Sequence, residues 1–219
     1  MLIPKQKPKA IITDVDSTLT ERTTWYELTE RLGASPYEHA SLFRKFLEGE
    51  ISYKQVKKDL FKLWNVNGPI HKDKLIKIFN EIPLRGEAFS LINKLKEDGY
   101  TLCLISGSIE MFIAEIAKKF KVNHYYGNSI FHFDENGYWT DLEYTKDEKC
   151  LKVEQFEDFL EKTGFKAEEC IAIGDSENDL GIFGKIPGIV VNPKSDLLKE
   201  LAWQEVKYLP RVLQLLESI

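Results

Sequence analysis

The feature of this chain that most constrains its fold is a short apolar run that ends in two carboxylates. Residues 9–13 are mostly apolar and β-branched, which predicts a buried strand. Asp14 and Asp16 follow this strand directly. Like charges this close together repel, and burying either one is costly unless a metal, a ligand or solvent compensates. The sequence therefore predicts an internal strand that opens onto a polar site.

From Pro83 onward, segments of helical and of strand character alternate. This alternation predicts a parallel sheet with helices on both faces. One segment departs from it, because residues 131–144 alternate in hydropathy around Asn136-Gly137, the pattern of a β-hairpin. The predicted helices cover 87–97, 109–120 and 153–163, the predicted strands cover 100–106, 170–173 and 189–191, and residues 203–219 predict a last short strand and an amphipathic helix.

A helical insert separates the first strand from this alternation. Apolar residues recur at helical spacing from Trp25, from Leu42 and from Val56, and Ser52 is the expected N-cap of the third helix. An insertion of this length far exceeds an ordinary loop, and we expect it to form a lid. We predict an α/β protein with a doubly wound, Rossmann-like parallel sheet, an inserted helical cap and a small β-hairpin excursion. Its core domain comprises residues 1–20 and 80–219, and its cap domain residues 21–79.

The composition excludes several classes of protein. A net charge of -5, with acids interleaved among the lysines, disfavours a nucleic-acid-binding protein. Three cysteines without a CxxC spacing argue against a disulfide framework and against a zinc site. No segment reaches the ~20 apolar residues of a membrane span, and the first residues lack the apolar core of a signal peptide. We therefore expect a cytoplasmic protein without nucleic-acid or membrane partners.

Polar residues follow three of the predicted strands, and ligands bind at the carboxyl ends of strands in doubly wound sheets. Asp14 and Asp175 are hard oxygen donors of the kind that Mg²⁺ prefers. Ser106, the backbone N–H groups after it and Lys152 could hold a phosphate group. One carboxylate could then attack the phosphoryl group, while another, two residues along the strand exit, protonates the leaving group. The sequence leaves open whether Asp179 contacts the metal or only orders its loop.

Four segments in this order resemble the motifs of the haloacid dehalogenase superfamily, in its phosphoserine-phosphatase-like branch (subfamily IB). They are DVDST at 14–18, ISGS at 105–108, Lys152, and GDSENDL at 174–180. The resemblance covers nearly the whole chain, and the insert and the hairpin agree with that branch. It implies Asp14 as nucleophile and Asp16 as acid/base.

The resemblance also implies the remaining groups of the site. Mg²⁺ would be bound by the carboxylates of Asp14 and Asp175 and by the backbone carbonyl of Asp16. The phosphate would be held by Ser106, Gly107, Lys152 and Asn178, with Thr18 orienting the first loop. The reaction would be two in-line transfers, first from a small-molecule phosphate ester to Asp14 and then from phospho-Asp14 to water.

The sequence departs from that branch where the substrate's serine would be recognised. The branch carries a Glu nine residues after the nucleophile, but Thr23 stands there and Glu21 is two residues out of register. It carries an Arg in the cap where an ungapped alignment places Leu60. Losing both partners would leave the charges of phosphoserine unpaired. The candidate substrate pocket is instead formed by Thr23, Leu47, Tyr53 and Leu60, with Arg44 as a cation from another helical turn.

We therefore predict a Mg²⁺-dependent phosphatase that acts on a small phosphomonoester other than phosphoserine. Three alternatives stay open: phosphoserine phosphatase proper, a phosphotransferase with an acceptor other than water, and an inactive binding protein of the same fold. A receiver-type signalling domain also phosphorylates an Asp at a strand end, but it has no helical insert and is about 120 residues long.

Overall fold

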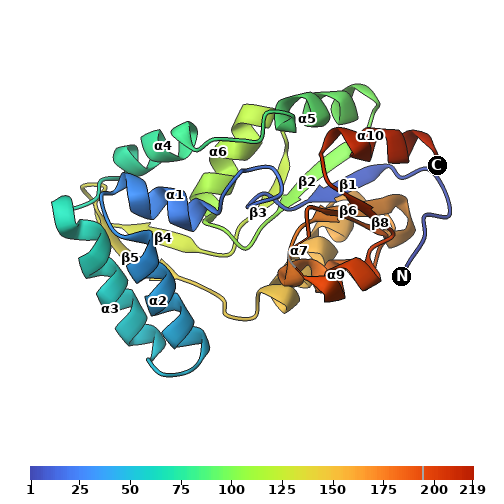
Figure 1. The fold of residues 1–219 in the computed structure, drawn as a ribbon. Coiled ribbons are helices and arrows are strands. Elements are labelled where there is room, and N and C mark those ends of the chain that lie inside the picture. The colour runs from blue at the N-terminus through green and yellow to red at the C-terminus, as the bar shows by residue number, and fades with distance from the viewer. Residues whose placement is uncertain (194) are drawn as a thin grey trace.

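The computed structural model describes residues 1–193 and 195–219. Within these residues, six parallel strands form one sheet in the order β3-β2-β1-β6-β7-β8 (Figure 1). The first predicted strand, β1, is central, with Thr13 paired in register with Leu104 of β2 and with Ile173 of β6. The strands span β1 Ala10–Thr13, β2 Thr101–Ile105, β3 His124–Tyr126, β6 Cys170–Gly174, β7 Gly188–Val191 and β8 Gln204–Val206.

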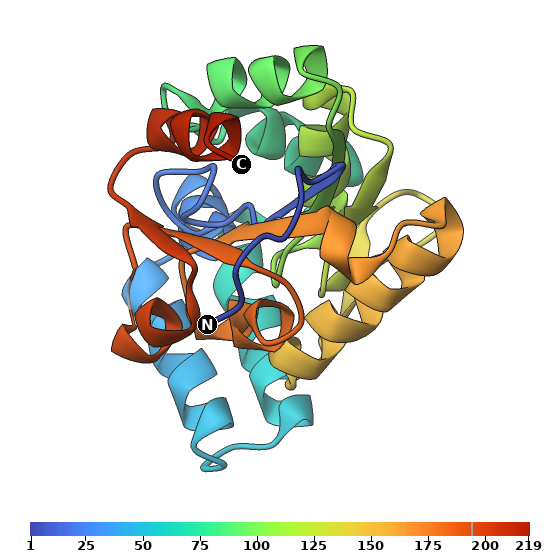
Figure 2. The same cartoon turned by 90° about the vertical axis from the view of Figure 1, so that its right-hand side faces the viewer.

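Helices cover both faces of this sheet, as Figures 1 and 2 show. Ile11 packs in the core on one face, while its neighbour Ile12 packs in the core on the other. Both faces are buried, which is why the strands are continuous apolar runs rather than alternating ones. One face carries α5 Ala88–Glu97, α6 Glu110–Phe120 and α10 Pro210–Glu217, and the other carries α7 Glu148–Thr163, α8 Leu180–Phe183 and α9 Asp196–Leu201.

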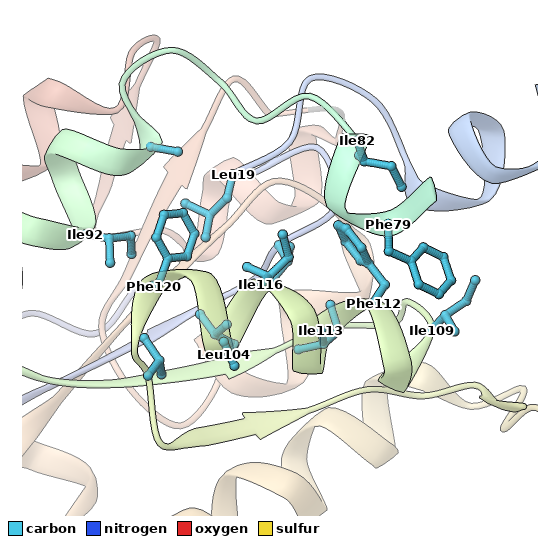
Figure 3. Close-up of a cluster of buried hydrophobic side chains, with 14 of the residues drawn as sticks. Leu19, Phe79, Ile82, Ile92, Leu104, Ile109, Phe112, Ile113, Ile116 and Phe120 are labelled. Atoms are coloured by element: carbon cyan, nitrogen blue, oxygen red, sulfur yellow. The ribbon is translucent and has the colours of Figure 1, made fainter. Parts of the chain in front are cut away.

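The segment between β1 and the alternating part is helical, as predicted. Its helices are α1 Thr24–Arg31, α2 Pro36–Leu47, α3 Tyr53–Trp64 and α4 Lys72–Glu81. Ser52 caps α3 by accepting a hydrogen bond from the backbone N–H of Gln55. The last of these helices also belongs to the main core, because Phe79 lies against Phe112 of α6 with ring centroids 5.7 Å apart (Figure 3). The division into core and cap domains stays a prediction.

The predicted hairpin is present as β4 Ile130–Phe133 and β5 Trp139–Glu143, and it packs against α3. The Tyr53 hydroxyl donates to the carbonyl of Leu142 at 2.8 Å, and Lys57 pairs with Asp141 at 2.6 Å. The hairpin therefore ties the helical insert to the rest of the molecule. None of the helices in the described residues is both long and apolar enough to cross a bilayer.

Some elements differ from their predicted bounds. Helix α7 begins at Glu148 rather than at residue 153, because Asp147 caps it and its first turn is polar. Gly164 ends this helix in the left-handed conformation, as expected. The short edge strand β3 and the six-residue helix α9 were not predicted, since neither has enough residues to show a hydropathy period.

Trp64 joins the insert to the hairpin. Its side chain is fully buried, and its indole N–H donates to the Thr29 hydroxyl at 3.0 Å. Its ring lies 6.0 Å from that of Trp25 in α1 and 5.3 Å from that of Trp139 in β5. Aromatic contacts of this kind stabilise a fold beyond the area they bury. Trp64, which belongs to α3, thus contacts both α1 and the hairpin strand β5.

We predict that Trp64→Ala lowers the free energy of unfolding by about 3–5 kcal/mol, because it removes a large buried ring and leaves a void. Urea unfolding monitored by circular dichroism measures this change. Val66→Ala is the matched control, since Val66 lies two residues away and is 61% exposed. We expect it to stay within about 0.5 kcal/mol of the parent protein. Equal losses for the two variants would contradict the role of Trp64.

Candidate active site

The carboxyl ends of β1, β2 and β6 meet beneath a cavity of about 350 Å³. These three strands are neighbours in the sheet, so the residues that follow them emerge side by side. Asp14, Ser106 and Asp175, the first residue after each strand, all line this cavity. The helical insert and the end of the hairpin form its other walls. The topology therefore brings together the strand exits that the sequence singled out.

A buried lysine links two of the acidic residues. Lys152, in the second turn of α7, is 1% exposed, and its ammonium donates to Asp14 Oδ1 at 2.9 Å and to Asp179 Oδ1 at 2.7 Å. Burial alone would lower the pKa of Lys152, but the two carboxylates raise it above its usual value. The ammonium is therefore charged at neutral pH. A charge this deeply buried is stable only when it is paired in this way.

Three carboxylates in the cavity floor are spaced to hold a metal ion. Asp14, Asp175 and Asp179 are all buried, and each offers an oxygen within 4.8 Å of the others. Lys152 contacts two members of this group, Asp14 and Asp179. Hard oxygen donors gathered this closely fit a divalent cation such as Mg²⁺. The Thr18 hydroxyl donates to Asp175 at 3.3 Å, which is how the first loop contacts the third strand exit.

Asp179 orders the loop that carries Asp175. Its Oδ2 accepts hydrogen bonds from the backbone N–H groups of Asp175 at 3.1 Å and Ser176 at 3.3 Å, while its Oδ1 accepts from Lys152. A Cβ at Gly174 would lie 2.3 Å from Asp179 Oδ2, so this position requires glycine. Both oxygens of Asp179 are engaged within the protein. Asp179 therefore orders this loop, and its place in the acidic cluster keeps it among the candidate metal ligands.

Asp16 occupies a different environment from Asp14. Its Oδ1 accepts from the backbone N–H of Thr24 at 3.1 Å and also from the Thr24 hydroxyl. Desolvation by burial raises its pKa to about 7, with a smaller contribution from the charge of Asp14. The loop then turns at Ser17, which has a left-handed φ of 62° and whose carbonyl accepts from Arg85 at 2.7 Å. Asp16 therefore holds a proton more readily than an ordinary carboxyl does.

Other residues of the cavity lining offer hydrogen-bond donors. Ser106 is fully buried, and its hydroxyl has no hydrogen-bond partner in the described part of the chain. Gly107 is next to it, where an added Cβ would lie 2.6 Å from Glu148 Oε2. The Asn178 amide donates to the same Glu148 oxygen at 2.6 Å. The predicted phosphate-binding residues Ser106, Gly107 and Asn178 thus line one cavity, with Lys152 at its floor beside Asp14.

The far end of the cavity is apolar. Thr23, Tyr53 and Leu60, three of the predicted pocket residues, line the cavity. Leu47 does not, which corrects that expectation: it lies one turn beyond Phe43 at the end of α2, is 45% exposed, and lines an adjacent shallow hollow. Arg44 is exposed and is also absent from the lining, so it does not supply the cation that the sequence suggested.

His39 is the one imidazole in the cavity lining among the described residues. It is 8% exposed, its Nδ1 lies 2.7 Å from the Thr29 hydroxyl, and its ring packs edge-on to Trp25 and Trp64. Desolvation by burial lowers its pKa to about 4. His39 is therefore neutral at pH 7.

Several residues of this site were not found from the sequence. Glu148 and Tyr144 precede or begin α7 in a stretch that reads as a polar loop, and no motif marks them. Phe43, Phe46 and His39 have the spacing of an ordinary amphipathic helix, which does not distinguish a cavity wall from a packed core. Only the packing of the insert against the hairpin makes them neighbours of the strand exits.

Comparison with known proteins gave consistent matches. A family model of haloacid dehalogenase-like hydrolases matches residues 8–184. The phosphoserine phosphatases of Archaeoglobus fulgidus and Methanocaldococcus jannaschii are each 28% identical over 199 residues, 90% of this chain. The match spans 56% of the former protein and 92% of the latter. A solved phosphoserine phosphatase with a phospho-aspartyl intermediate analogue superposes with a TM-score of 0.74 at 25% identity, covering 96% of this chain and 99% of that one.

We predict that Lys152→Met destabilises the metal-free protein by about 3–5 kcal/mol, because it leaves Asp14 and Asp179 buried without their cation. Denaturant unfolding in the presence of a chelator measures the change. Lys149→Met, an exposed position on the same helix, is the control and should have little effect. Equal free energies of unfolding for the two variants would show that the buried ion pairs of Lys152 do not stabilise the protein.

The neutral, buried His39 predicts a dependence of stability on pH. Its pKa is about 4 in the folded protein and 6.5 when unfolded, so the unfolded chain binds the extra proton first. Above pH 6.5, the neutral His39 makes its full contribution to the free energy of unfolding. This contribution, about 3 kcal/mol, is lost as the pH falls from 6.5 towards 4. We expect His39→Gln to remove that part of the acid sensitivity. Unfolding curves for both proteins between pH 7 and 4 that run parallel would contradict this assignment.

Proposed function

Because the chain belongs to the haloacid dehalogenase-like hydrolases, we propose that it is a Mg²⁺-dependent phosphatase that hydrolyses a small phosphomonoester through a phosphorylated Asp14. One observation supports this most strongly. A buried carboxylate, Asp14, lines a cavity beside a charged lysine, two further carboxylates and the Ser106 hydroxyl, which has no partner among the described residues. With a divalent cation bound, this set can hold a phosphate dianion and attack it.

The carboxylates of Asp14 and Asp175 and the backbone carbonyl of Asp16 would hold Mg²⁺. When bound, the metal supplies positive charge that lets an anionic carboxylate approach an anionic phosphoryl group. Lys152 fixes the position of Asp14 through its 2.9 Å hydrogen bond. Ser106, the backbone N–H of Gly107 and the Asn178 amide would donate hydrogen bonds to the phosphoryl oxygens.

The reaction would proceed in two transfers at phosphorus. In the first, an Asp14 oxygen forms a bond to phosphorus while the bond to the ester oxygen breaks, and Asp16 donates its proton to that oxygen as the alcohol leaves. In the second, the Asp16 carboxylate takes a proton from a water molecule whose oxygen attacks phosphorus. The bond between phosphorus and Asp14 then breaks and releases phosphate. The pKa of Asp16, near 7, suits a group that gives and accepts a proton in one cycle.

We further propose that the substrate is not phosphoserine, although the curated relatives carry that name. An amino-acid substrate brings an ammonium and a carboxylate, and each needs a partner when it leaves water. Thr23 and Leu60 stand where the resemblance would place those partners, and both line the cavity. The A. fulgidus relative is also longer, and the chain spans just over half of it.

We predict that Asp14→Asn lowers kcat at least about a thousandfold, since the amide cannot act as the nucleophile. Phosphate release from a panel of small phosphomonoesters, with Mg²⁺ and after chelation, measures this loss. The control is Asp98→Asn, an exposed aspartate that pairs with Lys94 far from the site, which should retain the parent rate. Chelation should stop the parent enzyme, and added Mg²⁺ should restore it. Equal rates for Asp14→Asn and the parent would rule out the proposed nucleophile.

A further inference from the structure

We propose that the group esterified to the phosphate is an uncharged, apolar alcohol or phenol about the size of an aromatic ring. This inference rests on the proposed phosphatase function and names the class of substrate for the same cavity. The phosphate end of that cavity is polar and charged. The walls that remain for the rest of the substrate come from the helical insert and from the chain after the hairpin.

Aromatic side chains form most of these walls. Six of them, here called the aromatic wall, line the cavity: Trp25, Tyr26, Phe43, Phe46, Tyr53 and Tyr144. They come from α1, α2, α3 and the segment after β5. Leu42, Val56, Leu60 and Leu142 lie between them. A cavity of about 350 Å³ with such a lining fits a compact apolar group.

Four rings of the aromatic wall contact one another, so this part of the wall is formed before a ligand enters. The ring centroids of Phe43 and Tyr144 are 5.4 Å apart, and those of Phe46 and Tyr53 are 5.7 Å apart. Phe46 also lies 6.3 Å from Tyr144. These rings join α2 to the segment after β5 and to α3. A preformed apolar cavity binds apolar groups without a large ordering cost.

A carboxylate in this part of the cavity would find no countercharge. No Lys or Arg is among the described residues that line it. The nearby Lys146 is engaged elsewhere, because its ammonium donates to the Leu47 carbonyl at 3.1 Å and lies over the Phe46 ring. His39 lines the cavity but is neutral at pH 7. Placing an anion there would cost its hydration without a compensating partner.

This part of the cavity also suits an ammonium group poorly. The carboxylates that line the cavity are Asp14, Asp16, Asp175 and Glu148, and the first three belong to the phosphate end. Glu148 already accepts from the amide of Asn178 at 2.6 Å and from the Tyr144 hydroxyl at 3.1 Å. Both of its oxygens therefore already accept hydrogen bonds from neutral groups of the protein. The aromatic wall presents hydrocarbon to the substrate rather than a free acid.

Three esters that share one phenol test this proposal on the unaltered enzyme. They are 4-ethylphenyl phosphate, tyramine phosphate and O-phospho-L-tyrosine, which carry no charge, one ammonium, and an ammonium with a carboxylate. Their leaving oxygens are chemically similar, so differences in kcat/KM report how well the cavity binds the rest of each substrate. We expect the uncharged ester to exceed the zwitterion about tenfold or more and also to exceed the ammonium ester. The highest value for either charged ester, or equal values for all three, would overturn the proposal.

A pair of variants tests the reason for this preference. Thr23 is exposed, lines the cavity and makes no side-chain capping bond, so Thr23→Arg adds a cation without burying it in the core. We expect it to raise kcat/KM for phosphotyrosine relative to 4-ethylphenyl phosphate about fivefold. Thr23→Gln, of similar length and uncharged, should leave the ratio as it is in the parent. If both variants give the same ratio, the lack of a cation is not what excludes the carboxylate.

The same measurements separate this inference from the proposed function. Turnover that needs Mg²⁺ and Asp14 but favours a charged ester, O-phospho-L-serine included, would overturn the inference and leave the phosphatase function intact. No Mg²⁺-dependent, Asp14-dependent release from any of these esters would overturn both.

Discussion

The site depends on one buried ammonium shared by two carboxylates. Lys152 contacts Asp14, which ends the central strand, and Asp179, which in turn holds the backbone of Asp175. Three separate parts of the chain, the first strand exit, helix α7 and the loop after β6, are therefore positioned by a single charge. Such a group is stable inside a protein only when every member is paired. It gathers carboxylates that can bind a divalent cation, and that cation would in turn attract a phosphate ester.

The charged groups of the cavity and its aromatic lining come from different parts of the molecule. The strand exits hold the charged groups, because parallel strands end at one edge and bring them together. The helical insert and the segment after β5 supply the aromatic wall. The insert is joined to the hairpin through Trp64, Tyr53 and Lys57. In the function proposed here, the core carries out the chemistry at phosphorus and the insert selects the alcohol. The similarity to phosphoserine phosphatases therefore supports the proposed chemistry at phosphorus more directly than it supports any particular alcohol.

The residues at the strand exits could be predicted because each follows a recognisable buried strand. The hairpin could be predicted from Asn136-Gly137, and the N-cap of α3 from Ser52. His39, Phe46 and Glu148 could not. Their place at the cavity depends on how α2 and the start of α7 pack across the molecule, and an amphipathic spacing is the same whether its apolar face meets a core or a cavity. Leu47 was assigned to the pocket for that reason, although it lies one turn beyond it.

The central claim is that Asp14 becomes phosphorylated during turnover. Quenching the enzyme in acid while it hydrolyses 4-ethylphenyl phosphate, followed by peptide mass spectrometry, tests this directly. The account predicts one phosphoryl group on the peptide that contains Asp14 in the parent protein, and none in Asp14→Asn. Steady turnover with the phosphoryl group on another residue, or with that peptide unmodified under conditions that trap acyl phosphates, would contradict it.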